Sequence, residues 1–254
     1  MGSYPVTGAI DQRLLGQLDV VAKIAAANAE EERGDGSEPP APRKTGELEI
    51  QSTGTGFYVD TKGSILTNAH VVEGCSALTV GEGISAELVA EAGEADLALL
   101  RAPANPTNGV ARFSSRPARL NADVTVIGFP LHGLLGGLNV TRGAISSTSG
   151  IRGDDDYFQM TAAVQPGNSG GPVVNIFGAV IGVVVSKLDA VKVWEVTGDI
   201  PQNINFAIRG ELAKLFLTKH NVGFEIEMSQ AKLEPATLAE DAGKYTVLIS
   251  CWGG

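Results

Sequence analysis

The stretch Gln165-Pro-Gly-Asn-Ser-Gly-Gly-Pro-Val-Val-Asn175 contains one hydroxyl group, three glycines and two prolines, and it ends in a β-branched run. Glycine adopts backbone angles that other residues avoid, so the pattern predicts a tight turn followed by a buried strand. Ser169 lies inside this turn, where the backbone N–H groups of Gly167, Asn168 and Ser169 can converge on one point. A nucleophile beside such donors is what acyl transfer requires. Without partners elsewhere for Ser169, a glycine-rich hairpin with an incidental serine is the better interpretation.

Two other short motifs supply those partners. His70 is embedded in the apolar run Leu66-Thr-Asn-Ala-His-Val-Val72, where an unpaired imidazole would be costly to bury. Asp96 leads directly into the apolar run Asp96-Leu-Ala-Leu-Leu100, and a half-buried carboxylate requires a hydrogen-bond donor. We therefore expect His70 to accept the proton of Ser169 and Asp96 to orient the imidazole and stabilise its charged form. The N–H groups of the turn would then bind the oxyanion.

The same turn also fits G-x-S-x-G, the nucleophile elbow of α/β-hydrolases. That fold requires the order Ser, Asp, His, which Ser169, Asp189 or Asp199, and His220 would satisfy. However, the elbow must lead into a helix, and Gly-Gly-Pro-Val-Val is a poor helix start. The chain also lacks the alternating helices of an α/β sheet, so we disfavour this alternative.

Composition limits the class of protein. The 254 residues include 32 glycines and few aromatics, which favours short strands and tight turns. The net charge of −10 argues against nucleic acid or an anionic membrane as a partner. No apolar run approaches the roughly 20 residues of a membrane span, and the first residues do not resemble a signal peptide. Cys75 and Cys251 form neither a disulfide framework nor a metal cluster, and a bond between them is the less favoured alternative. No cofactor or metal is expected.

The chain reads as all-β between two less regular ends. Apolar spacing predicts a helix over residues 11–31, and a charged, proline-containing linker follows to residue 44. Two sets of about six short strands come next, separated by a proline-rich crossover over residues 103–116. The first set is predicted at residues 47–50, 54–59, 64–67, 77–80, 86–89 and 96–100. The second set is predicted at residues 124–129, 139–146, 158–163, 173–176, 180–186 and 204–208. A helix over 211–220 and strands at 224–227 and 245–251 complete the chain.

Together the motifs resemble those of a known family. Thr67-Asn-Ala-His-Val-Val72, Asp96-Leu-Ala-Leu-Leu100 and Gly167-Asn-Ser-Gly-Gly-Pro172 look like the three catalytic motifs of trypsin-like serine proteases. Further landmarks resemble the HtrA (Deg) branch of that family: Gly54-Thr-Gly-Phe57, Ile127-Gly-Phe-Pro130, Thr141-Arg-Gly-Ala-Ile145 and Ile204-Asn-Phe-Ala-Ile-Arg209. The resemblance covers about residues 46–220.

The resemblance implies a double β-barrel serine endopeptidase with His70, Asp96 and Ser169 in the cleft between the barrels. The barrels would span about 46–102 and 117–210, followed by the helix at 211–220. Residues 1–45 would be an N-terminal helical extension with its linker. Residues 221–254, too short for the PDZ domain of many HtrA proteases, would be a C-terminal extension. The alternative, from another functional class, is a catalytically silent protease-fold binding or scaffold domain.

The resemblance also implies a substrate pocket and partners. Ala163 and Val164 would line the pocket floor, with Val185 and Ile204 on its walls. Because no acidic residue stands at the floor, we expect cleavage after small to medium apolar residues of protein or peptide substrates. By resemblance the protein would be exported or periplasmic and a homotrimer, with residues 4–30 available for assembly. The polar stretch 187–203 would adjoin the oxyanion loop 162–168, so that the resting state could be inactive.

Overall fold

The computed structural model describes residues 48–103, 109–132, 134–186 and 204–254. The chain divides into two units, of which the second spans Glu47–Gly254 and contains all the described elements. The expected helix at 11–31, the linker to residue 44 and the polar stretch 187–203 lie outside the described residues.

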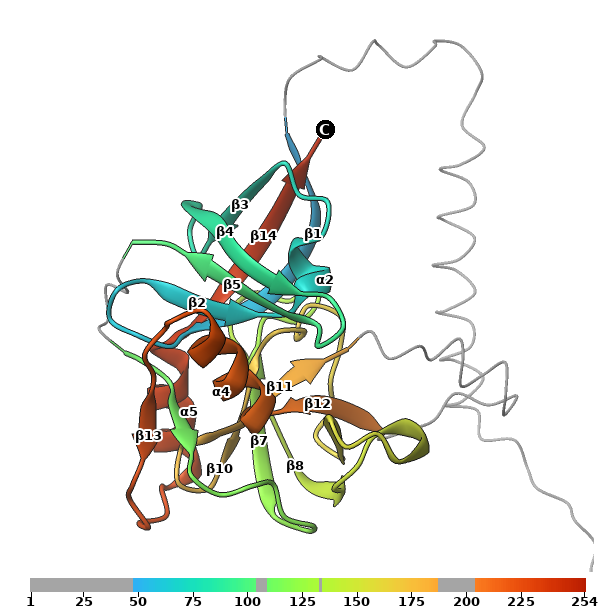
Figure 1. The fold of residues 1–254 in the computed structure, drawn as a ribbon, viewed down its shortest axis with the longest axis vertical. Coiled ribbons are helices and arrows are strands. Elements are labelled where there is room, and N and C mark those ends of the chain that lie inside the picture. The colour runs from blue at the N-terminus through green and yellow to red at the C-terminus, as the bar shows by residue number, and fades with distance from the viewer. Residues whose placement is uncertain (1–47, 104–108, 133, 187–203) are drawn as a thin grey trace, which may run out of the picture. The chain divides into compact units, whose positions relative to one another are not determined.

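Six antiparallel strands close the first barrel (Figure 1), in the order β1-β14-β3-β4-β5-β2. They are β1 (Glu49–Tyr58), β2 (Ser64–Thr67), β3 (Ala77–Val80), β4 (Ile84–Ala92), β5 (Leu97–Arg101) and β14 (Thr246–Gly253). Residues Leu97 to Leu100 are all fully buried, because β5 faces the barrel interior on one side and neighbouring elements on the other. This explains why the β5 segment reads as continuously apolar.

The first barrel departs from the sequence-based expectation. We expected it to end near residue 102 and residues 221–254 to form an extension, but β14 lies between β1 and β3 and pairs with both. In Figure 1 the C-terminal strand, in red, lies between the blue and teal strands of the N-terminal half. The two predicted strands at residues 47–50 and 54–59 are one bulged strand, β1. The C-terminal end of the chain therefore supplies one of the six strands of the first barrel.

The second barrel agrees with all six predicted strands. Its order is β10-β7-β8-β9-β12-β11, and a pairing between β10 and β11 closes it. The strands are β7 (Asp123–Gly128), β8 (Asn139–Ser147), β9 (Tyr157–Met160), β10 (Pro172–Asn175), β11 (Val180–Val185) and β12 (Asn205–Arg209). The short strands β6 (Arg112–Ser114) and β13 (Glu225–Glu227) extend the sheet beyond β11. Every residue of β11 is buried, since Val184 faces the barrel core whereas Val183 and Val185 pack in the larger core shared with the first barrel.

The described helices are few and short. They are α2 (Ala69–Val72), the 3₁₀ turn η1 (Ile151–Gly153), α4 (Gly210–Lys219) and α5 (Pro235–Gly243). Helix α4 confirms the predicted helix at 211–220 within one residue at each end. Helix α5 was not predicted, although Glu234 caps it by accepting from two backbone N–H groups and Pro235 begins it. No helix among the described residues is long and apolar enough to cross a bilayer.

Cys75 and Cys251 form a disulfide. The bond joins the segment after α2 to β14, two parts of the chain separated by 176 residues. The structure therefore has the pairing that the sequence analysis left as the less favoured alternative. Spacing in the sequence could not reveal the pairing, because it depends on β14 completing the first barrel.

Candidate active site

His70 and Asp96 form a close pair at one end of the first barrel. Nδ1 of His70 lies 2.7 Å from Oδ2 and 2.9 Å from Oδ1 of Asp96. The backbone N–H of His70 donates to the same carboxylate at 3.0 Å, and the Asn68 side-chain amide donates to the Asp96 carbonyl at 2.8 Å. The side chains are only 16% and 19% exposed. The carboxylate is thus fixed by two donors of one residue, which leaves the far ring nitrogen of His70 available as a base.

Ser169 lies in the tight turn predicted for it, between β9 and β10, and is 3% exposed. Gly167 and Gly170 have φ angles of +96° and +83°, so the turn requires glycine at both positions. The Asn168 N–H donates to the Gln165 carbonyl, which withdraws it from the expected cluster of donors. Among the described residues, the N–H groups of Gly167 and Ser169 have no hydrogen-bond partner. Two donors therefore remain where three were expected.

Thr55 on β1 connects the nucleophile turn to both barrels. Its buried hydroxyl donates to the Gly167 carbonyl at 2.6 Å and accepts from the Phe129 N–H at 3.0 Å. Its own N–H donates to the Ser169 carbonyl at 2.8 Å. The approach is so close that a Cβ on Gly170 would lie 2.2 Å from the Thr55 carbonyl oxygen. This network fixes the turn of the second barrel against the edge of the first.

The hydroxyl of Ser169 is held by Ser186, directly after β11. The two hydroxyl groups are hydrogen-bonded, and the Ser186 N–H donates to Ser169 Oγ at 3.2 Å. Among the described residues, Ser169 makes no hydrogen bond to His70. The structure thus brings all three predicted residues to the junction of the barrels, with the serine oxygen engaged by Ser186.

Comparison with known proteins identifies the family of the chain. Residues 54–183, just over half of the chain, match the trypsin-like peptidase domain family. The chain belongs to that family. DegS, a serine endoprotease of Escherichia coli, is 32% identical over 184 residues, which are 68% of this chain and 49% of DegS. The serine endoprotease structure from Yersinia pestis matches with a TM-score of 0.57 and 31% identity, covering 68% of this chain and 59% of that one.

These relatives identify the chain as an HtrA-like member of the trypsin-like peptidases. An uncharacterized protein of Sinorhizobium fredii, y4bJ, is 41% identical over 220 residues, 85% of this chain and 34% of that protein. The chain thus spans about a third of the length of y4bJ and about half of the length of DegS. The antiparallel double barrel excludes the α/β-hydrolase alternative, whose fold is a mainly parallel sheet.

The four residues expected at the substrate pocket of this peptidase differ in exposure. Ala163 and Ile204 are exposed and Val164 is half-buried against the second-barrel core. Val185 is 6% exposed and packs in the larger core, so its side chain is directed into protein. A substrate would contact this part of β11 through the backbone.

Tyr157 at the start of β9 lies close enough to Asp96 for the negative charge of that carboxylate to affect its hydroxyl. Burial raises the pKa of the Tyr157 hydroxyl, and the negative charges of Asp96, Asp154 and Asp156 raise it further. Tyr157 therefore remains neutral beside the carboxylate that pairs with His70. Sequence reasoning missed Tyr157, Thr55 and Ser186. For Thr55 the only local sign is a hydroxyl between two glycines in a strand.

Proposed function

We propose that this peptidase domain is a serine endopeptidase that hydrolyses peptide bonds through an acyl-enzyme. The observation that carries the proposal is the His70–Asp96 pair, with Nδ1 2.7 Å from the carboxylate, beside a buried serine in a glycine turn. His70 would take the proton from Ser169 as it attacks the carbonyl carbon, and later give it to the leaving amine. Asp96 would hold the ring tautomer and stabilise the imidazolium.

The oxyanion would be bound by the N–H groups of Gly167 and Ser169. Their lack of hydrogen-bond partners among the described residues supports this role, whereas the engaged N–H of Asn168 would contribute none. Two such donors are worth several kcal/mol of transition-state stabilisation in comparable sites, at about 3 kcal/mol for each. Thr55, which donates to the Gly167 carbonyl, would fix the peptide between Gly167 and Asn168, which lies between the two donors in the chain.

Catalysis would begin with a rotation of the Ser169 side chain. Its Oγ now binds Ser186, and attack requires that it turn toward the free nitrogen of His70. We interpret this arrangement as a resting state. The His70–Asp96 pair, and the two N–H groups of the turn that have no partner among the described residues, support an enzyme over a catalytically silent scaffold domain.

The test is labelling by a fluorophosphonate probe, which reacts with activated serines. The wild type should be labelled and should cleave a protein substrate, and Ser169→Ala should abolish both. Ser85→Ala, at an exposed position on β4, is the matched control and should behave as wild type. An unlabelled wild type with its fold intact would overturn the proposal in favour of the scaffold.

The proposed substrate preference is for small to medium apolar residues before the scissile bond. It is supported by Ala163 and Val164, which place no carboxylate where a lysine or arginine would bind. The proposed substrates are proteins or peptides, because relatives are named as endoproteases. The proposed location is exported or periplasmic, because one of these relatives is named a periplasmic endoprotease. The trimer stays a prediction, since residues 4–30 lie outside the described part. A peptide library cleaved mainly after lysine or arginine would contradict the preference.

A further inference from the structure

The second barrel holds a cavity of about 310 Å³ at the end remote from Ser169. Three strands show this separation. β7 begins at the cavity with Asp123 and ends beside the Gly167 turn, β10 runs from that turn to Asn175 at the cavity, and β11 returns from the cavity toward Ser186. A strand of six residues spans about 20 Å. The cavity is therefore distinct from the proposed catalytic site, and its volume is at the lower end of the range for small-molecule sites.

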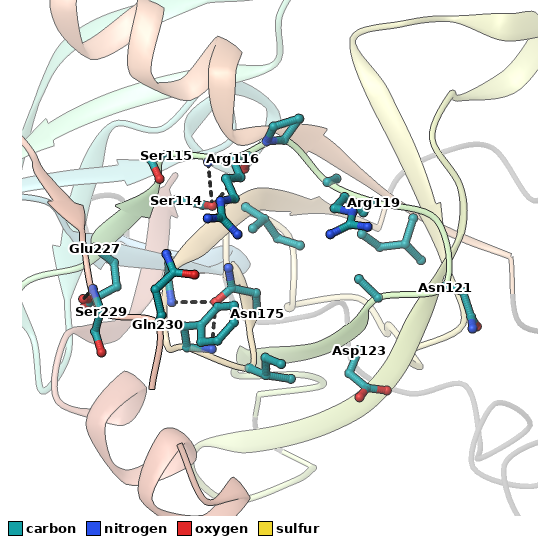
Figure 2. Close-up of a pocket in the computed structure, with 18 residues that line it drawn as sticks. Ser114, Ser115, Arg116, Arg119, Asn121, Asp123, Asn175, Glu227, Ser229 and Gln230 are labelled. Carbon is teal, nitrogen blue, oxygen red and sulfur yellow. Dashed lines mark hydrogen bonds between the residues drawn. The ribbon is translucent and has the colours of Figure 1, made fainter. Parts of the chain in front are cut away.

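Two guanidinium groups stand at the rim of this cavity (Figure 2). Arg116 and Arg119 lie on the segment between β6 and β7, and their side chains point toward the cavity. Within the described part of the chain, neither side chain has an ion pair or hydrogen bond. In a protein with a net charge of −10, two unpaired arginines at one rim are a local concentration of positive charge. Guanidinium groups bind carboxylates with matching geometry.

The floor of the cavity is apolar. Ala118, Ile145 and Ile181 line it, and all three belong to the buried core of the second barrel. The cavity thus opens onto the end of that core. A ligand that fits both parts must present an apolar stem to the floor and an anionic group to the rim.

The carboxylates near the rim set a limit on the charge of the ligand. Glu227 accepts from Arg112 at 3.4 Å and from the Ser229 N–H at 2.7 Å, so its charge is already engaged. Asp123 is exposed and, within the described residues, forms no ion pair with either rim arginine. Arg116, Arg119 and Asp123 together leave one net positive charge at the rim, which a ligand with one negative charge would balance. A polyanion would be repelled by Asp123.

From this arrangement we propose that the cavity binds a small organic monocarboxylate with an apolar stem. Its carboxylate lies between Arg116 and Arg119 and its stem contacts the floor at Ile145 and Ile181. The proposal is independent of the peptidase activity, because no residue of the cavity belongs to the proposed catalytic machinery.

Isothermal titration with 4-methylpentanoate tests it, with 4-methylpentanamide as a probe of the same shape and no charge. The acid should bind saturably with a dissociation constant in the roughly millimolar range, and the amide should not. Arg116→Gln and Arg119→Gln should each weaken binding by about tenfold, because each removes a charged hydrogen bond. Asp123→Asn should tighten it by about two- to fivefold, because it removes a nearby repulsion.

Arg152→Gln is the matched control, since this arginine is exposed on η1 and outside the cavity. It should leave the affinity unchanged. All the variants alter exposed side chains, so their unfolding midpoints should stay close to wild type and a loss of binding can be assigned to the site. Equal binding of acid and amide, no saturable binding of the acid, or an effect of Arg152→Gln equal to that of Arg119→Gln would each overturn the proposal.

Discussion

At the scale of single residues, the hydroxyl of Thr55 links the two barrels through two hydrogen bonds, and its removal should affect both stability and activity. It accepts from Phe129 and donates to Gly167, both in the second barrel, while its own strand belongs to the first. Thr55→Val keeps the shape of the side chain but leaves the part-buried N–H of Phe129 and the buried carbonyl of Gly167 without their hydrogen bonds to Thr55. We expect a loss of about 1–3 kcal/mol in unfolding free energy, measured by urea denaturation. We also expect a fall in kcat, since the peptide between Gly167 and Asn168, which lies between the two proposed oxyanion donors, is no longer fixed.

Thr55→Ser is the control for this prediction, because it retains the hydroxyl and removes only the methyl group. It should recover most of the kcat lost in Thr55→Val. If both variants lost activity equally, packing of the methyl group rather than the hydrogen bonds would explain the effect.

The sequence predicted His70, Asp96 and Ser169 but not Thr55 or Ser186. Each of the first three residues lies in a motif whose local pattern reveals a polar group that needs a partner. The partners of Thr55 are 112 and 74 residues away in the chain, so its role exists only after both barrels form. Ser186 follows an apolar strand like any surface serine, and only the fold brings it to Ser169.

At the scale of elements, β14 shows the limit of pattern reading. The sequence predicted a strand at 245–251, and the structure confirms one at Thr246–Gly253. Its partners could not be predicted, because strand pairing is decided by which barrel edge lacks a neighbour. The same holds for β6 and β13, which pair in parallel across more than a hundred residues. Local patterns therefore predict the strands, whereas long-range contacts determine how they close into a barrel.

Ile249 at the centre of β14 tests whether this strand is part of the barrel core. It is fully buried, and its Cδ1 fills the space above Gly56 of β1. Ile249→Ala should lower the unfolding free energy by about 2–5 kcal/mol, because it leaves a cavity. Val247→Ala, at a half-buried position of the same strand, should cost distinctly less. Equal and small losses in urea denaturation would show that β14 contributes little to the first barrel.

At the scale of the whole molecule, alkaline stability depends on buried tyrosines. Burial raises the pKa of Tyr245 far above its ordinary value of about 10. Above about pH 10 the Tyr245 hydroxyl loses its proton in the unfolded chain but keeps it in the folded chain. The free energy of unfolding therefore falls as the pH rises above about 10. The slope is about 1.4 kcal/mol per pH unit for this residue. Tyr245→Phe should remove it, as measured by denaturation at a series of pH values, and an unchanged slope would contradict the assignment.

The disulfide gives the molecule a dependence on redox conditions that its core alone would not. Cys75 and Cys251 close a loop of 176 residues that contains most of both barrels. A crosslink over so long a loop restricts the unfolded state strongly, so its loss should cost roughly 2–5 kcal/mol. Protein that is reduced while unfolded and then refolded with reductant should show this loss in urea denaturation. The double variant Cys75→Ala, Cys251→Ala should be equally weakened and insensitive to reductant.

The disulfide should also protect the activity against heat, because Cys75 lies five residues after His70 and its N–H bonds to Val72 of α2. The reduced protein and the double variant should therefore lose activity at a lower temperature than the oxidised wild type. Equal stability of the oxidised and reduced wild type would show that the barrel closes without help from the bond.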